Sequence, residues 1–251
     1  MRTRSTVGSD DRAVSDVVGY VLIFSLITLS IGAITVGGFS TLQDRQDAER
    51  INNAERAFDV FAANMEDVYR DGAPSRATEM RLSGGTLRYG EPVTITIANT
   101  ANPDISTTVQ TTPLVYADGR TEIIYVAGAV IRSERGAAVM LREPPFEITA
   151  DSTVVPIIAM TAPSNQPTIS GEATRIRAES TRRNPIPNPD LSADGNDITI
   201  TVESPRSGAW ERYFEQQVGS ENFKNSGQSL EVKVETDRIS TPISRIDLHI
   251  R

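Results

Sequence analysis

The chain has 251 residues, a formal net charge of −8 and an isoelectric point near 4.9. It contains no cysteine, which excludes disulfide bonds and thiolate metal sites. The acidic balance argues against a nucleic-acid partner, because recognition of phosphates needs a basic surface.

The first element expected along the chain is a transmembrane helix. An uncharged apolar run extends from Val17 to Phe39. At 1.5 Å per helical residue, a run of this length can cross a hydrocarbon core of about 30 Å. The apolar core of a secretory signal is shorter, roughly 7 to 15 residues, so a leader cleaved at Gly37-Gly38 is the weaker alternative. The hydroxyls within the run can bond to the helix's own carbonyls: Ser25, Thr28, Ser30 and Thr35.

The basic residues before this run set its expected orientation. Arg2, Arg4 and Arg12 precede it, and arginine or lysine beside a span favours the cytoplasmic side. We therefore expect a single-pass protein of the cell membrane, with a cytoplasmic N-terminus and an extracellular C-terminal part.

A short motif stands between the polar leader and the apolar run. It reads Arg12-Ala13-Val14-Ser15, and its arrangement resembles the class III signal of archaeal type IV pilins and archaellins. In that family a membrane peptidase cuts on the cytoplasmic side, after the small residue, and the hydrophobic helix stays on the mature protein. The resemblance covers roughly residues 1–40 and implies a cut between Ala13 and Val14. It also implies three kinds of partner: a prepilin peptidase-like membrane protease, membrane lipid, and like or related pilin subunits.

Asp16 is the acid nearest to the expected new amino terminus. Haloarchaeal pilins usually have proline at this place, and many bacterial pilins have glutamate where this chain has Val18. We hypothesise that the Asp16 carboxylate pairs with the Val14 α-ammonium of a neighbouring subunit and sets the register. The alternative is a solvated or headgroup-level residue, or an N-cap of the helix. The acidic, cysteine-free composition, in which Lys224 and Lys233 are the only lysines, fits a haloarchaeal surface protein.

The helix is expected to continue beyond the membrane as an amphipathic extension. Residues 40–69 contain no proline or glycine, and Asp71-Gly72 with Pro74 predicts the end of the helix. The stripe can pack on the chain's own β domain, which we favour, or form a coiled coil with another subunit. Its apolar residues recur at spacings of three and four: Ile51, Ala54, Phe58, Phe61, Met65 and Val68.

The rest of the chain alternates with a period of two, which predicts short β-strands. Such segments occur at 80–84, 86–90, 93–98, 121–134, 137–143, 152–160, 174–180, 197–204, 229–235 and 243–250. Pro156 implies an edge or a bulge, and residues 181–197 are expected to form a loop. A short helix should follow Ser204-Pro205, with Trp210 either buried against the sheet or exposed to a sugar or partner. The predicted fold class is α+β, with a mainly antiparallel head that is a sandwich or a layered meander.

The sequence offers no catalytic constellation. The single histidine, His249, is expected to face outward from a strand whose Leu248 and Ile250 face the core. Asp194 and Asp197 flank a turn that is better explained by solvation than by calcium binding. We therefore predict no catalytic residue, no metal site and no cofactor.

Four segments and one leading function follow from these observations. The segments are a leader (1–13), a transmembrane helix (14–39), an amphipathic extension (40–71) and an extracellular β-rich head (77–251). The leading function is a pilin-like structural subunit of a type IV pilus-like filament or of its assembly machinery. The alternative is a membrane-anchored surface protein that does not polymerise and binds a partner through a β-sandwich-like domain; an enzyme ranks third.

Overall fold

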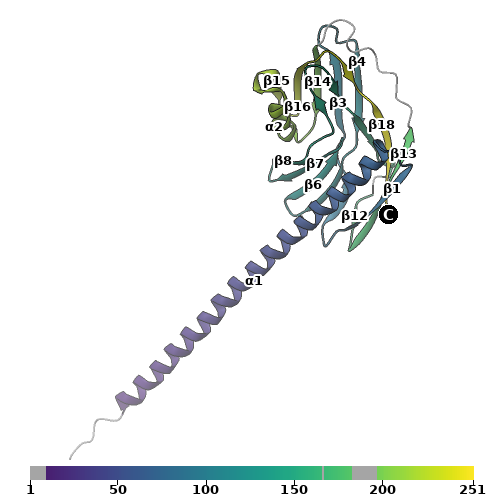
Figure 1. The fold of residues 1–251 in the computed structure, drawn as a ribbon. Helices are drawn as coiled ribbons and strands as arrows, with labels where there is room; N and C mark the ends of the chain where they lie inside the picture. Colours follow the sequence, from purple (N-terminus) through teal and green to yellow (C-terminus); the bar gives the residue numbers. More distant parts are fainter. Residues whose placement is uncertain (1–9, 166, 183–196) are drawn as a thin grey trace, which may run out of the picture. The chain divides into compact units, whose positions relative to one another are not determined.

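A computed structural model describes residues 10–165, 167–182 and 197–251. It contains an N-terminal apolar helix and a β-rich, mostly antiparallel domain with few helices, in agreement with the predicted α+β class (Figure 1). The chain divides into two compact units, one up to Arg50 and one from Ile51 to Arg251.

Helix α1 spans Asp10–Tyr69. It ends where the sequence predicts, because Gly72 adopts a positive φ of 74° and Pro74 follows. The N–H of Ala73 donates back to the Asp67 carbonyl over 2.9 Å, which closes the last turn.

The apolar stripe of α1 is buried inside the second unit. It packs with residues of two sheets, so the prediction that the stripe contacts the chain's own β domain is confirmed. No surface of this stripe is left for a coiled coil with another chain. Each of its side chains is at most 8 % exposed: Ile51, Ala54, Phe58, Phe61, Met65 and Val68.

The described strands form four sheets. The four-stranded sheet has the order β1 (Ser75–Arg81), β13 (Ala173–Arg182), β18 (Ile243–Ile250), β11 (Ile157–Thr161). The six-stranded sheet has the order β12 (Ile169–Ser170), β2 (Thr86–Tyr89), β5 (Leu114–Asp118), β6 (Thr121–Val126), β7 (Ala129–Glu134), β8 (Ala137–Arg142). The five-stranded sheet has the order β15 (Phe223–Ser226), β16 (Ser229–Glu235), β14 (Asp197–Glu203), β3 (Val93–Asn99), β4 (Ser106–Thr111). The three-stranded sheet has the order β17 (Ile239–Ser240), β10 (Thr153–Val154), β9 (Glu147–Ile148).

The six-stranded sheet lies between two apolar layers. In β6, Ile124 and Val126 pack with the five-stranded sheet and α2. Ile123 and Tyr125 point to the other side, where they pack with α1 and the four-stranded sheet. Because both faces are covered, these strands read in the sequence as nearly continuous apolar runs.

This double burial hides a hairpin from sequence analysis. Residues 121–134 read as one strand-like segment, but they fold as β6 and β7 around Ala127 and Gly128. Both turn residues have positive φ, 50° and 88°, as a two-residue hairpin turn requires.

Two prolines divide a pair of parallel strands. β10 pairs with β17 and β11 pairs with β18, both in parallel, which the sequence does not predict. Pro156 lies between β10 and β11, and Pro242 lies between β17 and β18. Proline has no N–H to donate to a β-ladder. Each of the two segments therefore leaves the three-stranded sheet at its proline and enters the four-stranded sheet. Pro156 precedes β11, an edge strand of the four-stranded sheet, which agrees with the edge position that this proline predicts.

Helix α2 (Ser207–Val218) carries the only tryptophan into the core. Trp210 is fully buried, and its ring stacks on Phe146 and Phe214 at centroid distances of 6.2 and 6.4 Å. The alternative in which Trp210 is an exposed contact for a sugar or partner is therefore wrong. A short 3₁₀ helix, η1 (Ser220–Asn222), follows. The predicted loop at 181–197 falls largely on residues 183–196, which lie outside the described residues.

Phe61→Ala should destabilise the β domain by about 3–5 kcal/mol, because it removes a buried ring and leaves a cavity. Phe61 is 1 % exposed, and its ring meets that of Tyr125 edge-on at 5.0 Å. Urea unfolding of the full chain in mild detergent, followed by Trp210 fluorescence, measures the loss. The adjacent Val60 is 56 % exposed, so Val60→Ala should change the free energy of unfolding by less than about 0.5 kcal/mol. Equal effects of the two changes would contradict the burial of the stripe.

Candidate functional site

The predicted processing junction lies in the first turns of α1. The helix begins at Asp10, so the Ala13–Val14 peptide bond is part of its frayable N-terminal end. The side chains of Arg12, Ala13, Val14 and Ser15 lie outside the described residues. The cut after Ala13 stays a prediction.

Asp16 is an exposed residue inside the helix. Because α1 begins at Asp10, Asp16 is not the N-cap of the intact chain. A cut before Val14 would place it in the first turn of the new helix, where a carboxylate interacts favourably with the helix dipole. Its role in subunit register stays a hypothesis.

The apolar segment from Asp16 to Thr35 is long and apolar enough to span a membrane. Its 20 residues have a mean hydropathy of 2.3, and none of it is buried. Three of its hydroxyls are satisfied by the helix, as the sequence predicts. Thr28, Ser30 and Thr35 donate to carbonyls four residues earlier over 2.8, 2.7 and 2.8 Å. These bonds remove the cost of exposing unpaired hydroxyls to hydrocarbon.

A charged cleft of about 250 Å³ lies beside the C-terminal end of α1. Glu66 is its central residue, and it accepts from Arg70 over 2.9 Å and from Arg142 of β8 over 2.8 Å. Burial, and next the Glu66 carboxylate, raises the pKa of the neighbouring Tyr69 phenol. Glu66 is paired with both arginines, so this arrangement joins β8 to α1.

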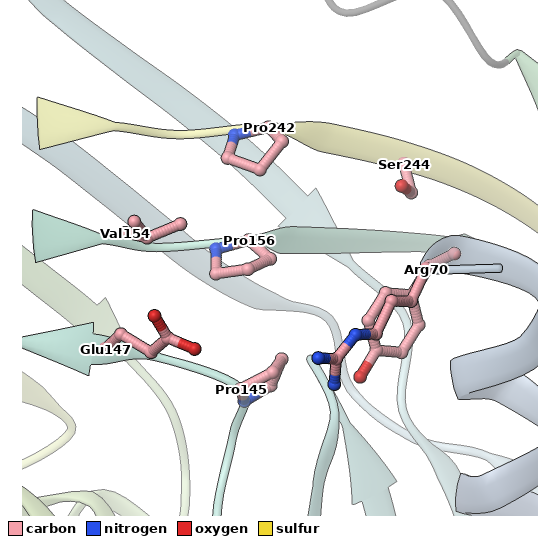
Figure 2. Close-up of a pocket in the computed structure, with 8 residues that line it drawn as sticks. Arg70, Pro145, Glu147, Val154, Pro156, Pro242 and Ser244 are labelled. Carbon is pink, nitrogen blue, oxygen red and sulfur yellow. The ribbon is translucent and has the colours of Figure 1, made fainter.

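A second hollow of about 220 Å³ adjoins this cleft and shares Tyr69, Arg70, Pro145 and Glu147 with it. Figure 2 shows three prolines, Pro145, Pro156 and Pro242, between Glu147 on one side and Arg70 on the other. The wall is rigid and largely apolar, with no histidine or cysteine among the residues that line it.

The other residues singled out in the sequence do not form a site. His249 is half-buried on β18 opposite Arg177, while Leu248 and Ile250 are buried, so its predicted orientation is confirmed. Asp197 is exposed at the start of β14, and Asp194 lies outside the described residues. Within the described ranges, no group of three or more histidine and acidic side chains is placed to hold a metal ion.

Sequence reasoning missed the ion pairs that flank α1. Arg132 of β7 reaches Glu55 over 3.1 Å, and Arg76 of β1 reaches Asp67 over 2.7 Å on another side of the helix. Nothing in the local pattern indicates the partner of Arg132, because strands whose pairing is not visible in one sequence separate it from Glu55. Arg76 and Asp67 are nine residues apart, and their contact depends on the turn between α1 and β1.

One family model matches nearly the whole chain. It describes a family of unknown function, DUF7289, and covers residues 12–249. The match includes part of the predicted junction, the apolar span and almost all of the β domain. No curated protein and no solved structure matches the chain significantly.

Gly128→Ala should destabilise the chain more than Gly119→Ala, by about 1–3 kcal/mol. Both glycines have a positive φ, 88° and 58°, so a new side chain strains the backbone at both positions. Only at Gly128 would a methyl group overlap Pro145 of the cleft; around Gly119 nothing lies within 4 Å. Urea unfolding of both variants checks the difference. A similar loss at both positions would show that Pro145 moves freely.

Proposed function

The chain belongs to the DUF7289 family, and we propose that it is a pilin-like structural subunit of an archaeal type IV pilus-like surface filament or of its assembly machinery. The observation that carries this proposal is an exposed, membrane-length apolar helix placed directly after Arg12-Ala13-Val14-Ser15. A prepilin peptidase-like protease would cut after Ala13 and leave this helix at the mature N-terminus. The helix then serves first as an anchor and later as a building element.

The orientation follows from the charges at the helix ends. The basic residues before the span keep the leader in the cytoplasm, where the peptidase cuts. The β-rich domain then lies outside the cell. In this arrangement the head is a structural and contact domain, without an enzymatic role.

Assembly exchanges lipid contacts of the apolar helix for contacts with other helices. Such contacts depend on close packing, which small residues permit. Gly19 and Gly32 lie on the exposed span with no atom near the position of a missing side chain. They leave room for the backbone of a neighbouring helix.

The second candidate is an anchored surface protein that is never assembled into a filament. Asp16 and Val18 favour it, because they depart from the residues common in pilins. The burial of the Ile51–Val68 stripe in the chain's own domain is compatible with both candidates.

Mass spectrometry of the mature protein should find Val14 as the first residue. Ala13→Leu should block the cut, because the small residue before the scissile bond is replaced by a bulky one. Ala13→Gly is the matched control and should still be cut. Sheared cells should release sedimentable filaments from the native and Ala13→Gly chains and none from Ala13→Leu.

The two candidates give different results in this experiment. A mature chain that begins at Met1 or Arg2 contradicts processing. Correct cleavage without filaments, under conditions where the other subunits are expressed, favours the anchored protein.

Asp16→Ala should reduce filament yield while cleavage after Ala13 and membrane insertion stay unchanged. The reason is the loss of the carboxylate that pairs with the Val14 α-ammonium of the next subunit. Asp16→Glu keeps the charge and should retain most of the yield. Unchanged filaments from Asp16→Ala would show that Asp16 is only a solvated residue.

A further inference from the structure

The edge strand β8 differs from the other sheet edges in the described part of the chain. β9, β12 and β17 have two residues each. β1 and β15 carry charged side chains, and β4 carries serine, threonine and glutamine. The carbonyls of β11 accept hydrogen bonds from Thr111 and Thr112. Such devices prevent an edge from pairing with another chain. From Ala137 to Met140, β8 has none of the devices just named; a bulge at Leu141, which has no partner on β7, and Pro144-Pro145 limit its length.

β8 also carries an exposed apolar surface. Outside α1, Val139 and Leu141 are the only large apolar residues that are exposed among the described residues, at 48 % and 42 %. They alternate with Ala138 and Met140, which pack toward the core on the α2 side. An open edge and exposed apolar side chains therefore occur on the same strand.

Two of the arginines near this edge are held by acidic partners, while Arg212 of α2 lines a hollow with Ala137, Ala138 and Val139. Arg132, which lies opposite Val139 on β7, pairs with Glu55 and Glu134. Arg142, at the end of β8, pairs with Glu66. Residues 137–141 carry no charge. A two-fold contact brings each residue near its own copy, so an uncharged strand can meet itself without repulsion.

We propose that β8 pairs antiparallel with β8 of a second copy of this chain, about a two-fold axis that passes through Val139. Directly opposite residues in an antiparallel pair share a face, so the alternation of β8 restricts the register. Centring on Val139 places Ala137 opposite Leu141 of the copy, and both are on the exposed face. It also places Ala138 opposite Met140. A shift by one residue would set exposed Val139 against Met140 of the core face.

This inference goes beyond the proposed function and does not rest on filament formation. Two copies anchored in the same membrane are confined to one plane, which raises their effective concentration and favours a short contact. An anchored protein that never polymerises would form the same pair.

Disulfide cross-linking in native membranes tests the register, because the natural chain has no cysteine. Val139→Cys in the full chain should give a covalent dimer on mild oxidation, since paired residues lie within the Cα distance that a disulfide allows. Thr108→Cys, on the polar edge β4, is the matched control and should stay monomeric. Ala137→Cys alone should not link, whereas co-expressed Ala137→Cys and Leu141→Cys chains should link to each other.

A charge on the edge provides a second measurement. Val139→Lys should abolish the dimer seen by native electrophoresis in mild detergent, and Thr108→Lys should leave it intact. Unchanged Trp210 fluorescence shows that both variants fold. Loss of cleavage and filaments in Ala13→Leu should leave cross-linking at Val139 intact, which separates this inference from the proposed function. Equal linking at Val139 and Thr108, linking of Val139→Cys only to a different protein, or a Val139→Lys chain with the native oligomeric state would each overturn the proposal.

Discussion

Burial of the α1 stripe between two sheets is the interaction on which the β domain depends. Phe58, Phe61 and Met65 fill the space between the six-stranded and four-stranded sheets, which share one apolar cluster with them. Fully burying a side chain of this kind contributes about 1.5–3 kcal/mol. Without the helix, residues such as Tyr125 and Ile246 would lose their cover. The segment from Ile51 onward is therefore part of the head, in line with the packing that the apolar stripe favours in the sequence.

Ion pairs fix the rotation of this helix segment more than they stabilise it. Arg132 and Arg142 hold Glu55 and Glu66, while Arg76 holds Asp67. Pairs that are about one-third exposed contribute little free energy, commonly 0–1 kcal/mol. Their positions on different sides of the stripe oppose rotation of the helix about its axis. Apolar contacts supply the energy, and the charged pairs select one orientation.

Local features of the structure were predictable from the sequence, and long-range pairing was not. The end of α1 before Gly72, the burial of Trp210 and the edge position of the strand after Pro156 follow from short-range chemistry. The parallel pairing of β11 with β18 joins segments more than eighty residues apart, and no local pattern encodes it. The hairpin at 121–134 was missed because double burial removes the polar alternation that marks a strand. The apolar span was evident from composition. The cleft and the open edge could not be predicted, because both depend on the order of the strands in the sheets.

The use of the stripe inside its own domain limits how copies of this chain can associate. A helix that has buried its apolar face against sheets cannot offer the same face to another subunit without unfolding that core. Contacts between copies must then use surfaces that folding leaves exposed. Within the described residues, two such surfaces are apolar. One is the helix segment from Asp16 to Thr35, which is exposed on all sides, and the other is the edge at Val139 and Leu141. In a membrane the first faces lipid or the helices of neighbouring proteins. The β8 edge belongs to the other compact unit of the chain, so pairing through it uses none of the surface of the span.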